Sequence, residues 1–487
     1  MDAHEYRDRV HGCWLGKNIG GTIGGPYEGK REFLDVPREY PSESIANDDL
    51  DLQLVWLLAV EKHGAALRAQ DLAEYWRRYV SYPFDEYGVA LKNIRLGLQP
   101  PATGHYDNWF RDSMGSPIRS EIWACLFPGE PERAAFYALQ DSQVDHWGEG
   151  VYGEIFLAAL ESRAFVEADI AKLVDGALAF IPGECKVARA VRLAADSFGA
   201  GRDLRGSRDE VLSLVGHHNF TDCAQNIAFT VLGLLHGKGA LLDSIVLASN
   251  CGYDVDCTAA TAGAIAGALA GGERVTAEAG DRLDERIVPG WGIEGAPVPG
   301  TITELTDRTV AQRGVVASGA DVGALERPFA LGEVPTFEPP VRVPWRVAVA
   351  QPSSGDAEPD LPPDARAVVS DTAYPDLGAF AAGGEGALLL QTTFTLSGKR
   401  TLRTLSVSSR PVRQWVDGAL VLDDADPKPF LPATHRTSVR VEPREYDAGS
   451  HRVTIEVRCG KDAPPQFAWI VADEKKHWAE GIEYGGA

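Results

Sequence analysis

The 487-residue chain lacks a hydrophobic run long enough to cross a membrane. A membrane-spanning helix needs roughly 18 or more apolar residues in succession, and Asp254 and Asp256 interrupt the best candidate. Residues 1–17 mix charged and apolar side chains from the start and lack the continuous apolar core of a signal peptide. We therefore expect a cytoplasmic protein with no membrane partner.

Cysteine is scarce and scattered. The seven cysteines form no Cys-x-x-Cys pair, which argues against structural zinc and favours free thiols in a reducing compartment. Positive charge is also in short supply, with 47 Lys and Arg against 70 Asp and Glu and a formal net charge of -23. Such a charge opposes non-specific attraction to nucleic acid or to an anionic membrane surface. We expect no nucleic-acid partner, although a small phosphorylated ligand remains compatible with this balance.

The segment 250–272 carries the most informative pattern in the chain. Asp254 and Asp256 are followed at once by a run of small and apolar residues, 257–269, that predicts a buried helix with Asp256 at its N-cap. Two carboxylates on a loop at a helix start suit a hard cation such as Mg²⁺. On this segment alone, an N-cap beside a solvated aspartate explains the pattern equally well.

A second acidic group opens another predicted helix. Asn47, Asp48 and Asp49 precede a strongly apolar stretch that continues to Val60. Capping and the helix dipole would by themselves account for these acids. Together, however, the two acidic groups supply enough carboxylates for one or two Mg²⁺ ions if the fold brings them together.

Glycines cluster in residues 16–31. The stretch nearly matches a phosphate-binding loop, but Arg31 stands where Ser or Thr would hold the metal and no strand precedes it. We predict instead that the glycines within 20–25 let the backbone turn tightly beside a cavity and present Glu28 to it. The alternative is an exposed loop glutamate.

Two glycine-bearing segments, 108–123 and 142–156, combine aromatic and polar side chains between predicted helices. This composition is typical of a pocket rim, although any one of the residues could be structural. The predicted substrate-binding residues are Trp109, Arg119, His146, Glu149 and Tyr152.

The character of the chain changes beyond Thr309. Helical patterns give way to short runs of alternating polarity, with Asp417-Gly418 as a hairpin turn and 435–443 among the predicted strands. We predict a multidomain protein with an all-α domain followed by an all-β, jelly-roll-like sandwich. The expected boundaries are 1–312 for the α domain, 313–345 for a linker and 346–487 for the β domain.

Three motifs resemble the ADP-ribosylglycohydrolase family: GCWLGKNIGGTIGGPYE ending in Glu28, NDD at 47–49, and GYDVDCTAATAGAIAGA at 252–268. The resemblance implies an all-α fold and Mg²⁺-dependent hydrolysis of an N- or O-glycosidic bond at the anomeric carbon of ADP-ribose. It implies that Glu28 transfers a proton or orients water beside the reacting ribose, with Asp49 and Asp256 as further catalytic carboxylates. The implied metal-binding residues are Asn47, Asp48, Asp49, Asp254 and Asp256.

The chain departs from the family at Asn47 and Cys257, where Thr or Ser is frequent. An amide oxygen can still bind Mg²⁺, whereas a thiol is a poor partner for a hard ion. The expectation is therefore one or two Mg²⁺ ions with a weakened second site. SMGSPIR at 113–119 replaces the family's glycine loop on the adenosine side.

These departures keep other functions open. The resemblance implies that the substrate is a small molecule or an ADP-ribosylated protein, and the alternative is a smaller N-glycoside or nucleoside without ADP. A non-enzymatic alternative is a nucleotide- or sugar-binding module with a degenerate metal site. The β region resembles accessory sugar-binding sandwich modules, most clearly at 412–424, which implies a carbohydrate ligand for that domain.

Overall fold

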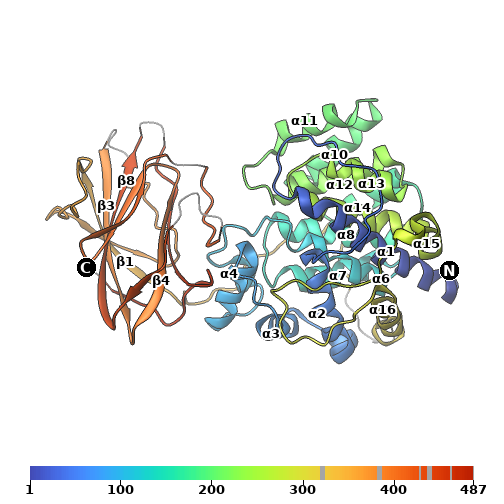
Figure 1. Ribbon diagram of the computed structural model, residues 1–487, viewed down its shortest axis with the longest axis horizontal. Coiled ribbons are helices and arrows are strands. Elements are labelled where there is room, and N and C mark those ends of the chain that lie inside the picture. Colours follow the sequence, from blue (N-terminus) through green and yellow to red (C-terminus); the bar gives the residue numbers. More distant parts are fainter. Residues whose placement is uncertain (318–323, 381–385, 427–428, 436–440, 461–462, 486–487) are drawn as a thin grey trace. The chain divides into compact units, whose positions relative to one another are not determined.

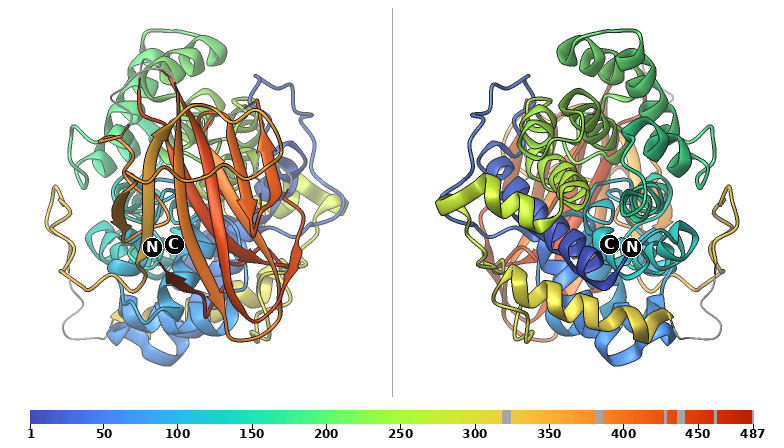
Figure 2. Two further views of the ribbon diagram at one scale, coloured as in Figure 1. Left: turned by 90° about the vertical axis from the view of Figure 1, so that its left-hand side faces the viewer. Right: turned by 90° about the vertical axis from the view of Figure 1, so that its right-hand side faces the viewer.

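The computed structural model describes residues 1–317, 324–380, 386–426, 429–435, 441–460 and 463–485. The chain divides into two compact units (Figures 1 and 2). The first unit contains Met1–Ser81 and Leu98–Val334, and the second contains Tyr82–Gly97 and Pro335–Ala487. An all-α part is thus followed by a β part, which confirms the predicted fold class.

The first unit is helical. Asp2 caps its first helix by accepting a hydrogen bond from the backbone N–H of Glu5 at 2.9 Å. Among the described residues, no helix is long and apolar enough to cross a membrane. The helices are α1 (Ala3–Gly24), α2 (Asp48–His63), α3 (Ala69–Tyr79), α5 (Ala102–His105), α6 (Glu121–Leu126), α7 (Pro131–Ser142), α8 (Glu149–Ala164), α9 (Ile170–Leu178), α10 (Lys186–Gly199), α11 (Leu204–Val215), α12 (Cys223–Gly237), α13 (Leu241–Ser249), α14 (Val255–Ala270), α15 (Gly272–Ala279) and α16 (Ile302–Ala317), with short 3-10 turns at Gly25–Tyr27, Gly64–Ala66, Pro117–Arg119 and Gly280–Arg282.

Helices α1 and α14 pack against each other through glycine (Figure 1). A Cβ added at Gly16 would come within 2.5 Å of the carbonyl carbon of Gly263, and one added at Gly24 within 2.6 Å of Asp256 Cα. Gly12 and Gly20 lie on the same face of α1 and are equally close to α14. The absence of side chains therefore lets the two backbones touch along their length.

This packing corrects the prediction for the glycine stretch. Most of residues 16–25 continue α1 rather than forming a turn, and the chain leaves the helix only at the 3-10 turn Gly25–Tyr27. The glycines were read as conformational freedom, whereas their regular spacing of four residues marks one face of a helix. Glu28 follows the 3-10 turn and is exposed.

The second unit begins with a helix taken from within the helical part of the sequence. Helix α4 (Asp85–Arg95) groups with the β region, although the predicted boundaries place residues 82–97 in the α domain. Arg95 Nη1 lies 2.8 Å from Glu480 Oε1, and Lys92 Nζ lies 4.1 Å from the ring centroid of Trp478. Because these partners are nearly 400 residues away, local composition does not reveal the insertion.

The remaining elements of the second unit are antiparallel strands. A seven-stranded sheet has the order β2-β1-β3-β8-β5-β6 with β10 also paired to β3, and a three-stranded sheet has the order β7-β4-β9 (Figure 2). The strands are β1 (Val343–Ala350), β2 (Arg366–Ser370), β3 (Gly386–Leu396), β4 (Arg400–Ser408), β5 (Val412–Val416), β6 (Ala419–Asp424), β7 (Arg444–Tyr446), β8 (Gly449–Cys459), β9 (Phe467–Asp473) and β10 (Glu483–Gly485).

Residues of both sheets build one hydrophobic core, which includes Trp345, Leu390 and Trp469. The predicted hairpin is present, with Asp417 and Gly418 at positive φ between β5 and β6. Most of the predicted strand 435–443 falls on residues outside the described ranges.

Candidate functional site

The two acidic groups predicted from the sequence lie at the N-termini of α2 and α14. Asn47 is the N-cap of α2, and its Oδ1 accepts a hydrogen bond from the backbone N–H of Asp49 at 3.0 Å. At α14 the N-cap is Asp254, and Asp256 lies in the first turn rather than at the predicted cap. Both helix N-termini favour negative charge, so the arrangement stabilises carboxylates close together.

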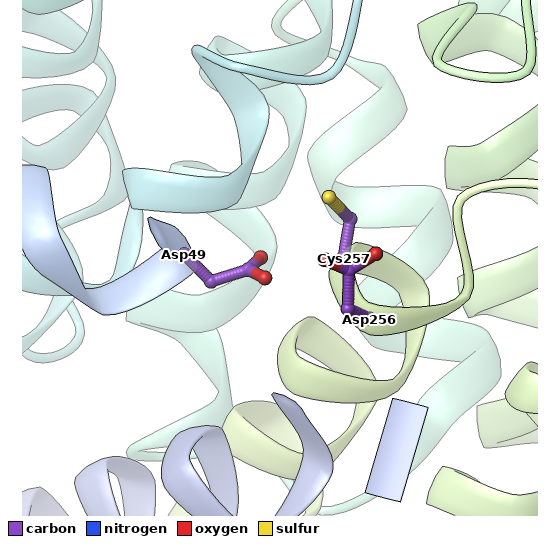
Figure 3. A group of neighbouring side chains, drawn as sticks. All are labelled: Asp49, Asp256 and Cys257. Atoms are coloured by element: carbon purple, nitrogen blue, oxygen red, sulfur yellow. The ribbon is translucent and has the colours of Figure 1, made fainter. Parts of the chain in front are cut away.

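The fold brings these acids into two overlapping groups. Asp49, Asp256 and Cys257 each offer a ligand atom within 4.8 Å of the others (Figure 3), and so do Glu28, Asp254 and Asp256. Asp256 belongs to both groups. The arrangement joins the ends of α1, α2 and α14 in one acidic site, which we call the carboxylate site. Asp48 is half-buried beside it, at the start of α2.

Backbone hydrogen bonds between the loop that follows α1 and the loop that precedes α14 hold Glu28 beside the carboxylate site. The Gly29 N–H donates to the Tyr253 carbonyl oxygen at 2.8 Å, and the Tyr253 N–H donates to the Lys30 carbonyl oxygen at 2.6 Å. Gly252 has φ +73, and an added Cβ there would meet the backbone of the Glu28 loop. Backbone hydrogen bonds in both directions therefore fix an exposed glutamate at the edge of a buried acidic group.

A buried polar network lies behind Asp49. Lys17 has no exposed surface, and its Nζ lies 2.8 Å from Glu121 Oε1 and 3.5 Å from Asp49 Oδ1. The same ammonium donates to the Ile118 carbonyl oxygen at 2.6 Å. Gln53 Nε2 donates to the second Glu121 oxygen at 2.8 Å and to the Asp49 carbonyl oxygen at 3.0 Å. The network neutralises one carboxylate and holds the first turn of α2 in place.

Lys17, Gln53 and Glu121 were not predicted as site residues from the sequence. Lys17 offered one usable signal, because it is a charged residue inside a helix whose neighbours are glycine and apolar residues. A lysine in such a place is buried only when paired. Its partner Glu121 lies 104 residues away, and no local pattern reveals that distance.

Burial dominates the electrostatics of the carboxylate site. It raises the pKa of Asp254 and of Asp256 well above the usual range, and the nearby charge of Glu28 raises both further. Burial also raises the pKa of Asp49, although the Lys17 ammonium opposes the shift. Carboxylates crowded in this way repel one another, and a cation among them would relieve the repulsion.

The unpaired oxygens of the site fit a divalent metal ion. Asp49 Oδ2, Asp254 Oδ2 and Asp256 Oδ1 are buried and have no hydrogen-bond partner among the described residues. Buried carboxylate oxygens without partners are costly, and oxygen ligands of this kind are those that Mg²⁺ prefers. Asn47 differs from the prediction in that its carbonyl oxygen is already used by the helix cap.

Two of the predicted substrate-binding residues lie in the interior rather than on a pocket rim. Arg119 has no exposed surface, and its guanidinium pairs with Asp141 at 2.8 Å and with Asp145 at 2.5 Å. His146 is equally buried, with Nδ1 3.0 Å from Asp145 Oδ1. The aspartates compensate the buried cation, so these residues organise the interior around α7.

Glu149 and Tyr152 also have structural partners. Both carboxylate oxygens of Glu149 accept backbone N–H groups at the start of α10, from Lys186 and Val187 at 3.0 Å each. The Tyr152 hydroxyl accepts the N–H of Leu331 at 3.2 Å. Helix α8, which begins at Glu149, therefore uses these two side chains to hold neighbouring segments.

Trp109 is the predicted residue that remains on an accessible aromatic surface. Its half-buried ring lies 5.9 Å from the His217 ring and 5.8 Å from the His218 ring, centroid to centroid. Arg31 Nη2 donates to the His218 carbonyl oxygen at 2.6 Å and so joins this cluster to the loop that carries Glu28. Burial, together with the charge of His218, lowers the pKa of His217 to about 4, so its ring is neutral at pH 7.

Residues 2–317 match the family model described as ADP-ribosylglycohydrolase. The chain belongs to the ADP-ribosylglycohydrolase family. A solved structure titled an ADP-ribosylglycohydrolase-related protein complex is 18% identical, and the match covers 64% of this chain and 99% of that chain with a TM-score of 0.45. No curated protein matches. Membership makes the chain a glycosidase, and its ADP-ribosylglycohydrolase region contains every residue of the carboxylate site.

Proposed function

We propose that the protein hydrolyses a ribosyl N- or O-glycosidic bond in an ADP-ribosylated or ADP-ribose-like substrate, with Mg²⁺ held by the carboxylate site. The observation that carries the proposal is the convergence of Glu28, Asp49, Asp254 and Asp256, together with the buried oxygens of the three aspartates, which have no hydrogen-bond partner among the described residues. Perturbed pKa values of buried acids cluster at functional sites, and the site has this property.

The residues that would hold the ion are Asp49, Asp254 and Asp256, whose buried oxygens have no hydrogen-bond partner among the described residues, with Asp48 next to Asp49 at the start of α2 as a further carboxylate. Bound Mg²⁺ would supply the positive charge that orients the vicinal hydroxyls of a ribose and makes a coordinated water more acidic. Lys17 occupies Asp49 Oδ1 and leaves Oδ2 to face the site. The chain thus presents one oxygen of Asp49 to a ligand in a fixed direction.

Glu28 is suited to proton transfer. It is exposed, whereas Asp254 and Asp256 beside it are buried, so it can exchange protons with water while the buried acids remain in place. Cleavage of a ribosyl bond develops positive charge on the sugar. The carboxylates of Glu28 and Asp256 stabilise that charge, and Glu28 accepts the proton of the attacking water.

The aromatic surface around Trp109 supports a substrate with a planar group. The Trp109, His217 and His218 rings are connected through Arg31 to the loop of Glu28. Aromatic faces of this kind stack on nucleobases. An adenine at one end and a scissile ribosyl bond at the carboxylate site fit an ADP-ribosyl group better than a single small sugar.

The experiment compares substrates and variants of the full chain after chelation and reloading with Mg²⁺. We expect release of ADP-ribose from an ADP-ribosyl-arginine or ADP-ribosyl-serine peptide, measured by mass spectrometry, and little turnover of simple nucleosides. Glu28→Gln should lower kcat about 10²- to 10⁴-fold while Mg²⁺ binding by calorimetry persists. Glu32→Gln, an exposed acid on the same loop, is the matched control.

Two results would overturn the proposal. One is full activity of an Asp49→Asn/Asp256→Asn double variant without metal. The other is turnover of nucleosides alone, which would move the substrate to the smaller N-glycoside class. Absence of both Mg²⁺ binding and hydrolysis would favour a binding module.

A further inference from the structure

A thiol lies inside the carboxylate site. Cys257 Sγ is within 4.8 Å of ligand oxygens of both Asp49 and Asp256, and Figure 3 shows the Asp49 carboxylate directed towards the α14 turn that carries the other two. All three side chains are buried, with 0% exposure for Asp49, 9% for Asp256 and 7% for Cys257. A sulfur atom beside two carboxylates is an unusual donor set for a site built for Mg²⁺ alone.

The two carboxylates have oxygens available to share with the thiol. Asp49 Oδ1 faces the Lys17 ammonium at 3.5 Å, but Asp49 Oδ2 and Asp256 Oδ1 are buried without a hydrogen-bond partner in the described part of the chain. The residues that carry these oxygens, Asp49 and Asp256, are at least nine-tenths buried. Asp256 Oδ1 supplies the second observation, independent of the cysteine, that a ligand belongs here.

The backbone keeps the three donors together. Asp256 and Cys257 are consecutive in the first turn of α14, and Gly24 lets α1 pack directly against this turn, where an added Cβ would lie 2.6 Å from Asp256 Cα. Asp49 is held from the other side by its position in the first turn of α2 and by Lys17. The donor set is therefore preorganised by helices rather than by a flexible loop.

We propose that Asp49, Asp256 and Cys257 form a mixed carboxylate and thiolate site that binds Zn²⁺ or a similar thiophilic divalent cation and competes there with Mg²⁺. The inference deepens the proposed function, and it rests on that function in taking Asp49 and Asp256 as cation ligands. On binding, the S–H bond of Cys257 breaks, a sulfur–metal bond forms and the proton passes to the solvent. A thiolate favours Zn²⁺ over Mg²⁺, because the softer ion bonds to sulfur and the harder one does not.

Cobalt reports sulfur ligation directly. Metal-free full-length protein titrated with Co²⁺ should develop a near-ultraviolet thiolate-to-cobalt charge-transfer band, and Cys257→Ser should lack it. Cys251→Ser is the matched control, because Cys251 is a buried free cysteine in the turn that precedes α14 but belongs to neither ligand group. The control should keep the full band.

Zinc affinity gives the second measurement. Competition with a chromophoric chelator should show that Cys257→Ser weakens Zn²⁺ binding at least about 10- to 100-fold, the range typical when only a residue behind a metal ligand is lost. Mg²⁺ affinity should stay the same or improve, because serine keeps an oxygen at this position.

The inference is overturned if wild type gives no charge-transfer band, or if Cys257→Ser binds Zn²⁺ as tightly as wild type. Circular dichroism checks that the variant folds. If it does not fold, cadmium NMR of the wild-type protein decides the matter, since a resonance typical of oxygen ligands alone would refute sulfur ligation. If the protein shows Mg²⁺-dependent hydrolysis but no charge-transfer band, the proposed function stands and sulfur ligation is refuted. If it shows the band but no ribosyl hydrolysis, sulfur ligation stands and the proposed function is refuted.

Discussion

Replacement of Lys17 by Met tests whether the buried network behind Asp49 supports the helical unit. The side chain has no exposed surface, and its ammonium lies 2.8 Å from Glu121 and 3.5 Å from Asp49. Met matches the aliphatic stem but removes the charge. Breaking a buried pair by removing one partner costs about 3–5 kcal/mol, because the other charge remains buried and uncompensated. We expect this loss at pH 8 in the free energy of unfolding.

The effect should depend on pH. Burial already raises the pKa of Glu121 above its usual value, and the Lys17 ammonium opposes the shift, so the variant should have a still higher Glu121 pKa. A carboxyl whose folded-state pKa exceeds the unfolded one destabilises the fold as pH rises. The penalty of Lys17→Met should therefore shrink when the pH falls from 8 to 5. In the wild-type protein the pKa of Lys17 is raised above its usual value. The stabilisation by the Lys17 ammonium is therefore fully present at every pH below the unfolded-state pKa of lysine, and it does not change between pH 5 and pH 8.

Scanning calorimetry of metal-free protein measures the change. At about 2 °C per kcal/mol for a domain of this size, the transition of the helical unit should fall by about 6–10 °C. Lys62→Met, at an exposed position of α2, should change the free energy of unfolding by less than about 0.5 kcal/mol. The double variant Lys17→Met/Glu121→Gln should recover much of the loss, because the pair is then removed as a whole. A loss below about 1 kcal/mol, or a double variant no better than the single one, would refute the reasoning.

Three further variants or conditions test other parts of the structure. Gly16→Val should destabilise the helical unit by about 3 kcal/mol or more in urea unfolding, because the valine side chain would overlap Gly263. The control Gly199→Ala should be nearly neutral, because an added Cβ there meets nothing within 4 Å. Equal effects of the two variants would contradict the glycine contact. Arg119→Lys should cost about 2 kcal/mol of stability, because lysine cannot reproduce the paired hydrogen bonds of the guanidinium, and it should leave Mg²⁺ affinity unchanged by calorimetry. Weaker Mg²⁺ binding at full stability would contradict this purely structural role. Burial raises the Asp256 pKa, so Mg²⁺ affinity should increase as the pH rises and the carboxyl loses its proton. Over the same pH interval the melting temperature of chelator-treated protein should fall. A pH-independent Mg²⁺ affinity would show that the carboxyl is already ionised.

Secondary structure followed closely from local pattern. The run 257–269 predicted a buried helix, and α14 spans Val255–Ala270. Short alternating runs beyond Thr309 predicted strands, and the described strands β1 to β10 all lie in that part of the chain. Helices and strands of this length are predictable from the period of their apolar residues, because one face of each must be buried. The position of Asp256 inside the first turn was missed by two residues, which is the scale at which caps are ambiguous.

The candidate site was predicted in composition but only partly in arrangement. Glu28, Asp49, Asp254 and Asp256 lie together in two overlapping groups, to neither of which Asn47 or Asp48 belongs. The predicted catalytic and metal-binding roles of all these residues stay predictions. Arg119 and His146 were placed on a pocket rim because charged side chains beside glycine suggest exposure. The buried Asp141 and Asp145 that pair with them could not be assigned as partners from spacing alone. The carbohydrate ligand of the β unit likewise stays a prediction.

By itself, the sequence determined the order of an α part and a β part, the helix starts that carry the acids and the conjunction of motifs that marks the family. Only the tertiary structure decided that the glycines of α1 contact α14, that residues 82–97 join the β unit and that Lys17 lies behind Asp49. The physical reason is the range of the forces involved. Periodicity and capping act within a few residues, whereas close packing and the neutralisation of buried charge join residues that the fold alone brings together. The placement of Cys257 Sγ among carboxylate oxygens belongs to this second kind.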